Sequence, residues 1–90
     1  MTSAEAAERF GRNLKRRRLA VGLSQEALGV RASLHRTAIS RMERGYTNPQ
    51  LDTLARLAGA AECTVADLAE GIEWLPGQNH KGRFSVPPPR

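Results

Sequence analysis

The chain has 90 residues, a formal net charge of +5 and one cysteine, Cys63. This length allows one small domain rather than two, and a single cysteine excludes an internal disulfide. The sequence has neither a signal peptide nor an apolar run long enough to span a membrane, which predicts a cytoplasmic protein.

Positive charge is concentrated in the first half of the chain. Up to Gly45 there are ten Lys or Arg residues against four acids, whereas the remainder has four against five. A basic half of this kind suits binding to a polyanion, and a solvated basic surface is the alternative. The run KRRR at residues 15–18 also fits a nuclear localisation patch, but its place inside a predicted helix disfavours that interpretation.

A long helix is predicted at the N-terminus. Thr2 and Glu5 have capping-box spacing, and Gly22 is suited to ending the helix. Three consecutive arginines, residues 16–18, cannot all face water at helical spacing, so one should turn inward and pair with an acid. The nearest suitable acid is Glu43. The expected buried stripe of this helix consists of Phe10, Leu14 and Val21.

The next stretch, SQEALGVRASLHRTAISRMERG at residues 24–45, predicts two short helices joined by a tight turn. Ser24 is a suitable N-cap for the first helix, whose period breaks at residues 32–34. In the second helix Ile39 and Met42 share one face, and the other positions are polar. A rigid helix with an outer face of Arg, Thr and Ser is suited to meeting base edges and phosphates. The outward residues of this helix are Arg36, Thr37, Ser40, Arg41 and Arg44.

Two further helices are predicted after Gly45. Residues 46–49 have turn chemistry, and a helix can begin at Pro49. Thr64 and Asp67 have capping-box spacing around a final short helix that Gly71 ends. The sequence therefore predicts an all-α fold, a compact five-helix domain over residues 1–70. The strongest apolar stripe, expected in its core, consists of Leu51, Leu54, Leu57 and Ala58.

Residues 71–90 are predicted to form a short C-terminal extension. Apolar residues alternate in residues 72–75 and 83–86, so the two segments can form a small β-hairpin. Its large side chains either fold back onto the helical core or contact a second protomer or another protein. The last residues, 87–89, are expected to be disordered. The candidate contact residues are Trp74, Leu75 and Phe84.

The blocks GLSQEAL, RTAISRMERG, NPQLDTLARLA and TVADL occur here in the order and spacing of the phage repressor and Cro family, also called the XRE family. The resemblance covers roughly residues 10–68. It implies a repressor-like helix-turn-helix domain from a bacterium or phage that binds double-stranded DNA. The second helix of the pair would then be the recognition helix, lying in the major groove.

The resemblance also implies roles for individual residues. Gln25 matches a glutamine that contacts a phosphate and braces the recognition helix, and Arg18 and Glu43 match an inward ion pair. The positions implied to contact bases are Arg36, Thr37 and Arg41. The two arginines among them favour guanine in each half-site. The remaining expected phosphate contacts are His35, Ser40, Arg44, Tyr46, Thr47 and Asn48.

Four positions depart from the family pattern. Ser33 stands in the sharp turn where glycine is common, and a left-handed backbone there would strain serine by roughly 1 kcal/mol. His35 stands where a Ser or Thr usually caps the helix, so its imidazole caps the helix, reaches a phosphate or is simply exposed. Gly29 replaces a small alanine at the helix crossing. Glu62 occupies a helix C-terminal position where glycine is frequent.

Two functions fit this sequence. The first is a sequence-specific transcriptional regulator, a homodimer on an inverted repeat of DNA, associated with the nucleoid. The alternative is an interaction protein, an antitoxin or controller, whose extension binds a protein partner and whose DNA binding is autoregulatory. Because no Cys–His pair, metal-ligand cluster or phosphate-binding glycine loop is present, we expect no catalytic site, metal or cofactor.

Overall fold

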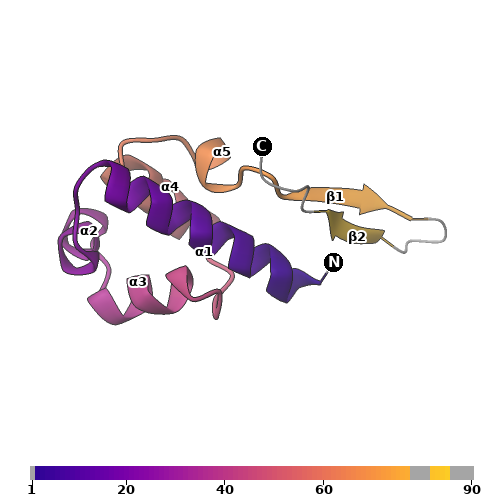
Figure 1. Cartoon of the computed structure of the whole chain (residues 1–90), viewed down its shortest axis with the longest axis horizontal. Coiled ribbons are helices and arrows are strands. Elements are labelled where there is room, and N and C mark those ends of the chain that lie inside the picture. The colour runs from indigo at the N-terminus through magenta and orange to yellow at the C-terminus, as the bar shows by residue number, and fades with distance from the viewer. Residues whose placement is uncertain (1, 78–81, 86–90) are drawn as a thin grey trace.

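A computed structural model describes residues 2–77 and 82–85 of the chain. Within these residues, helices form a compact group and a two-stranded antiparallel hairpin extends from it (Figure 1). This arrangement confirms the predicted helical fold with a small hairpin. The helices are α1 (Ser3–Ala20), α2 (Gln25–Ala32), α3 (Arg36–Glu43), α4 (Leu51–Ala60) and α5 (Val65–Leu68), and the strands are β1 (Glu73–Pro76) and β2 (Gly82–Ser85).

The helix ends follow the capping signals in the sequence. Thr2 Oγ1 accepts from the backbone N–H of the third helical residue of α1, and Ser24 Oγ does the same for α2. Thr64 and Asp67 form a complete capping box at the start of α5. Gly22, just after α1, has a φ of +73°, a conformation that glycine adopts without strain.

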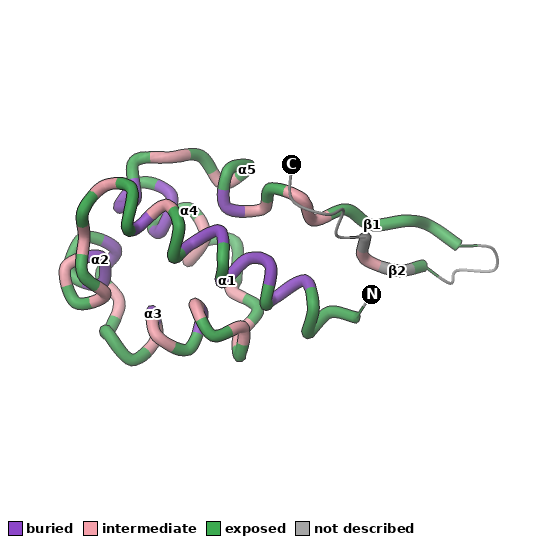
Figure 2. The backbone as a smooth tube through the Cα atoms, in the orientation of Figure 1, coloured by how far each residue is buried: buried purple, intermediate pink, exposed green. Residues whose placement is uncertain are grey.

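The core lies where α1 faces the other helices, and Figure 2 shows the buried segments turned toward one another. Ile39 and Met42 are buried on the inner face of α3, which confirms their predicted placement. Each of the other helices also has at least one large apolar residue that is fully buried or nearly so. These are Phe10 and Leu14 in α1, Leu28 in α2, Leu57 in α4 and Leu68 in α5.

The prediction that Leu51 belongs to the core is wrong. Leu51 is 74% exposed, Leu54 is half-buried and Leu57 is fully buried. Burial increases along α4 because the helix begins outside the core: Leu54 packs against the core from its edge, and Leu57 lies within it. The helix also starts two residues after Pro49, with Gln50 as its N-cap.

The hairpin carries the aromatic residues of the extension. Trp74 lies opposite Phe84 in the register, and their rings meet edge to face with centroids 5.2 Å apart. Trp74 remains 54% exposed, so it packs on its own hairpin rather than inside the helical core. Leu75 is also exposed. The residues expected to be disordered, 87–89, lie outside the described residues.

None of the helices in the described part of the chain has the length and apolar character required to cross a membrane.

Candidate nucleic-acid interface

The outer face of α3 presents uncompensated positive charge. Arg36, Thr37 and Arg41 are exposed, whereas Ile39 and Met42 of the same helix are buried. Among the described residues, neither Arg36 nor Arg41 has an Asp or Glu oxygen within 4.0 Å, although four other arginines do. These guanidinium groups can therefore bind an external anion or acceptor without breaking an internal ion pair.

The turn before α3 is tight and left-handed. Ser33 has a φ of 56° and a ψ of 42°, so the strain foreseen for a non-glycine residue in this turn is present. The N–H of Leu34 donates to the carbonyl of Gly29 at 2.8 Å, which closes the end of α2. At Gly29 a Cβ atom would lie 2.6 Å from the carbonyl oxygen of Leu34. The close approach of the turn to α2 therefore depends on glycine.

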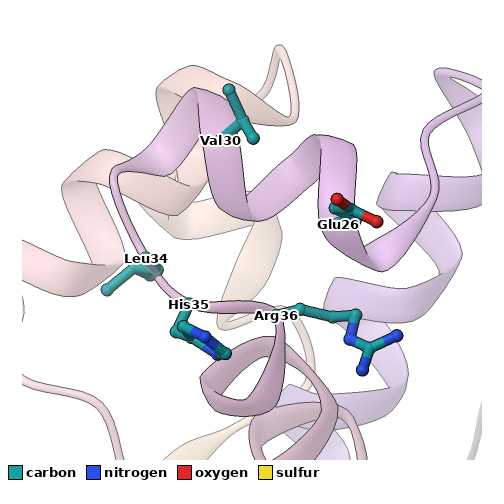
Figure 3. A pocket seen from close by; sticks show the side chains of 5 residues that line it. All are labelled: Glu26, Val30, Leu34, His35 and Arg36. Atoms are coloured by element: carbon teal, nitrogen blue, oxygen red, sulfur yellow. The ribbon is translucent and has the colours of Figure 1, made fainter.

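His35 is the N-cap of α3. Its Nδ1 accepts from the backbone N–H of Thr37 at 3.2 Å. Of the roles that the sequence leaves open for this histidine, the cap is the one formed within the chain, and the side chain is also exposed. Figure 3 shows the ring beside a hollow between α2 and the start of α3. The hollow is lined by Glu26, Val30, Leu34, His35 and Arg36.

A buried ion pair fixes the far end of α3. Arg18 donates from Nε to Glu43 Oε2 at 2.6 Å and from Nη2 to Oε1 at 2.9 Å. The hydrogen bond to this carboxylate raises the pKa of Arg18. Gln25, the first residue of α2, donates to Glu43 Oε1 at 3.2 Å. Glu43 therefore ties α1, α2 and α3 together, and Gln25 links the start of α2 to the end of α3.

A second polar area follows α3. Tyr46 is 63% exposed, and the guanidinium carbons of Arg44 and Arg41 lie 5.1 and 6.0 Å from its ring centroid. Thr47 and Asn48 line a groove that also includes Arg41. Ser40 is half-buried, and its carbonyl accepts from Arg44 Nε at 3.4 Å. The residues after α3 that are expected to contact phosphates therefore lie at its C-terminal end, whereas His35 and Arg36 lie at its N-terminal end.

Three extension residues stand apart from this surface. Trp74, Leu75 and Phe84 belong to the hairpin, which projects from the end of the molecule opposite α2 (Figure 1). They cannot contribute to a surface built around α3 of the same protomer. Any contact that they make with another molecule is separate from the helix-turn-helix surface.

Gly11, which was not predicted to have a structural role, sets the position of α3. A Cβ atom at Gly11 would fall 2.7 Å from the carbonyl oxygen of Glu43 and still closer to that of Met42. Helix α1 can therefore lie against the end of α3 only without a side chain at this position. The sequence does contain a signal for this close packing. A glycine inside a strongly helical segment lowers helix stability by about 1 kcal/mol, so its presence indicates a packing reason.

Polar residues of α1 also hold the start of the extension. Asn13 is fully buried and donates from Nδ2 to the carbonyls of Leu68 and Glu70, each at 2.9 Å. Arg9 donates from Nε to the same Glu70 carbonyl at 3.2 Å. These bonds satisfy carbonyls at the end of α5. The described residues contain no group of three or more His, Cys, Asp or Glu that could hold a metal ion.

Comparison with known proteins supports the helix-turn-helix fold. The helix-turn-helix family model HTH_3 matches residues 14–68. The transcriptional regulator DdrOP3 of Deinococcus deserti is 40% identical over 57 residues, which cover 63% of this chain and 44% of that protein. The control protein C.BamHI of Bacillus amyloliquefaciens is 37% identical over 62 residues, covering 68% of this chain and 76% of that protein. The chain thus matches less than half the length of DdrOP3.

Two solved structures are similar over most of the helical part. The restriction-modification controller protein C.AhdI from Aeromonas hydrophila has a TM-score of 0.67 and 35% identity, covering 69% of this chain and 94% of that one. The DNA-binding domain of the P22 c2 repressor has a TM-score of 0.66 and 32% identity, covering 69% and 82%. The helix-turn-helix of this chain is therefore arranged as in a known DNA-binding domain.

Proposed function

This chain belongs to the HTH_3 helix-turn-helix family, and on that premise we propose that it is a homodimeric, sequence-specific regulator of transcription that binds an inverted repeat. The observation that carries the proposal is the outer face of α3. Its Arg36 and Arg41 have no acidic partner within the part of the chain that the structure describes. Its inner face is fixed by buried Ile39 and Met42.

The base contacts follow from placing α3 in the major groove. The groove is about 12 Å wide and admits an α-helix. Arg36 and Arg41 would each donate two hydrogen bonds to O6 and N7 of guanine. Thr37, exposed between them on the same helix, would contact a base at the neighbouring position.

The phosphate contacts would come from both ends of α3. At its start the cap residue His35 and the bracing Gln25 are available, and at its end the positive charge of Arg44 lies beside Tyr46. These groups would set affinity and orientation rather than sequence preference. The remaining members of this set are Ser40, Thr47 and Asn48.

The extension, residues 71–90, would form the dimer contact, while the domain of residues 1–70 would bind DNA. A two-stranded hairpin is marginal by itself in water, and Trp74 leaves much of its ring exposed. Contact with a second copy would cover that ring. Two recognition helices would then enter successive major grooves, about 34 Å apart.

A second candidate function is an autoregulatory controller or antitoxin whose hairpin binds a different protein. The exposed Trp74 and Leu75 favour it, because they lie away from α3 and stay accessible while DNA is bound. The similarity to C.BamHI and C.AhdI, a control protein and a controller protein, also favours it.

The first experiment is selection of bound fragments from the source genome with the purified full chain. Near-physiological salt is required, because non-specific binding to phosphates is strong at low salt. We expect enrichment of an inverted repeat, and a repeat upstream of the protein's own gene would favour the controller. Fragments without any common sequence would contradict a sequence-specific regulator.

Oligomeric state is tested separately by sedimentation of the free protein and of Trp74→Ala. A wild-type dimer that becomes a monomer in the variant supports the hairpin as the dimer contact. A wild-type dimer that Trp74→Ala leaves intact contradicts that role and leaves the tryptophan available to another partner.

A further inference from the structure

The side chain of His35, the N-cap of α3, contacts Thr37 twice through one nitrogen. His35 Nδ1 lies 3.2 Å from the backbone nitrogen of Thr37 and 3.1 Å from Thr37 Oγ1. A backbone N–H can only donate, so Nδ1 must carry a lone pair rather than a proton. The tautomer assigned from these contacts is therefore the one with its proton on Nε2.

This tautomer fixes the direction of the second contact. A nitrogen without a proton can only accept, so in this contact the Thr37 hydroxyl is the donor, and it shares the single lone pair of His35 Nδ1 with the Thr37 backbone N–H. A hydroxyl has one hydrogen and two lone pairs. While the hydrogen is used in this contact, Thr37 Oγ1 offers only acceptor capacity to an outside ligand.

We infer that Thr37 is a specificity-determining residue that accepts a hydrogen bond from a base amino group, and so selects adenine or cytosine on the strand it contacts. In the major groove N6 of adenine and N4 of cytosine are donors, whereas O6 of guanine and O4 of thymine are acceptors. An acceptor facing another acceptor gains no hydrogen bond, so guanine and thymine are disfavoured. This inference rests on the proposed function, because it requires α3 to lie in the major groove.

Thr37 and Arg36 would then recognise opposite patterns from adjacent positions. Arg36 has only donors and is suited to guanine, while Thr37 has only acceptor capacity. The His35 ring and the Arg36 side chain leave the start of α3 in different directions (Figure 3), so the arginine takes no part in the His35 contact. A threonine without this contact could donate or accept, and would not distinguish the bases.

The test is selection of sites from a randomised duplex pool with the full chain at pH 8. Wild type and Thr37→Ser should enrich adenine or cytosine at one position of each half-site. Thr37→Val keeps the shape but lacks the hydroxyl, so it should lose that preference alone. Replacing the selected adenine by purine, or cytosine by 2-pyrimidinone, removes the amino group. This should weaken wild-type binding about three- to ten-fold relative to Thr37→Val.

The variant His35→Ser separates the direction of the contact from the cap. Serine retains an oxygen that can cap the helix, so the fold should persist. Its hydroxyl can donate to Thr37 or accept from it, which no longer fixes the hydroxyl of Thr37. This variant should therefore accept all four bases at the Thr37 position while keeping the guanine preference of Arg36.

Four results would overturn the inference. Enrichment of guanine or thymine at the Thr37-dependent position, or an unchanged pattern for Thr37→Val, would do so while the proposed function stands. A long-range ¹H–¹⁵N correlation of the free protein should place the His35 proton on Nε2, and a proton on Nδ1 would refute the assignment without reference to DNA. Absence of any enriched sequence with wild type would instead overturn the proposed function, and the inference with it.

Discussion

Arg18 and Glu43 join the last turn of α1 to the last residue of α3 through two hydrogen bonds, at 2.6 and 2.9 Å. Their side chains are 9% and 3% exposed. Arg18 also donates from Nη1 to the carbonyl of Leu23 at 2.8 Å. The charged groups of this pair are therefore removed from water but satisfied within the protein, and the pair sets where the recognition helix lies.

Removing one member of this pair should cost much more than removing an exposed pair. Arg18→Ala leaves the buried Glu43 carboxylate without its countercharge, and we expect a loss of about 3–5 kcal/mol in the free energy of unfolding. Arg16 pairs with Glu70 on the surface at 3.2 Å, so Arg16→Ala should change stability by less than about 1 kcal/mol. Urea unfolding of both variants measures the difference.

The double variant Arg18→Met, Glu43→Met completes this comparison. Because neither charge remains, the buried site contains no uncompensated charge, and the double variant should be more stable than Arg18→Ala. Equal stability of Arg18→Ala and Arg16→Ala would refute the buried pair as a major contributor.

Arg36 and Arg44 should differ in how their removal affects specific and random DNA. If Arg36 contacts guanine, Arg36→Ala should weaken binding to the selected site by about 1–3 kcal/mol and binding to random duplex far less. Arg44→Ala should weaken both alike and reduce the salt dependence by about one phosphate contact. Titrations at several salt concentrations measure both effects. Equal losses on the two DNAs for Arg36→Ala would show that it contacts only phosphates.

Replacing Ser33 by glycine, the residue that its left-handed backbone favours, should stabilise the protein. A left-handed backbone costs a non-glycine residue about 1–2 kcal/mol, and glycine's greater freedom in the unfolded chain offsets about 0.5–1 kcal/mol of that. Ser33→Gly should therefore stabilise the protein by about 0.5–1 kcal/mol. Ser33→Ala keeps the Cβ atom and should give no gain. A destabilised Ser33→Gly in urea unfolding would mean that the serine side chain contributes more than the strain.

Asp67 should contribute to stability at neutral pH and lose this contribution in acid. The hydrogen bond from the backbone N–H of Thr64, at 2.9 Å, lowers the pKa of the Asp67 carboxyl. A lowered folded-state pKa gives stability that is present above the unfolded value, about 3.9, and lost as pH falls through the folded value. Asp67→Asn does not titrate. Its melting temperature should therefore fall less than that of wild type between pH 5 and pH 2, and parallel curves would contradict this role.

Local signals allowed much of the fold to be predicted. Thr2, Ser24 and Thr64 cap the helices expected of them, because a cap depends on residues within one turn. Helical spacing predicted that one arginine of residues 16–18 turns inward toward Glu43, and the family resemblance identified it as Arg18. At the site, the residues of α3 could be assigned to an inner and an outer face from their spacing alone.

Features that depend on how distant elements meet could not be predicted in this way. Leu51 fits the apolar stripe of α4 but lies beyond the core, since spacing does not show where a helix meets its neighbours. Gly11 matters only because the carbonyls of α3 lie against it. The contact between His35 and Thr37 is local, but it depends on the orientation of the imidazole, which a sequence does not contain.

Gly29 and Gly59 both lie within helices, and their replacement by alanine should have opposite effects. Alanine favours a helix interior by about 1 kcal/mol over glycine. At Gly59 no atom lies within 4 Å of the added Cβ, so Gly59→Ala should gain most of that amount. At Gly29 the Cβ would lie 2.6 Å from the carbonyl oxygen of Leu34, a backbone atom of the turn that cannot move without shifting α3. Overpacking of this kind costs about 1–3 kcal/mol, which exceeds the propensity gain.

Gly29→Ala should therefore be less stable than wild type in urea unfolding, and Gly59→Ala more stable. DNA binding adds a second measurement, because relief of the clash would move the start of α3. Gly29→Ala should bind the selected site more weakly even at a temperature where it is fully folded, whereas Gly59→Ala should bind like wild type. If both variants were stabilised equally, the turn would be able to yield, and the position of α3 would not depend on the close approach at Gly29.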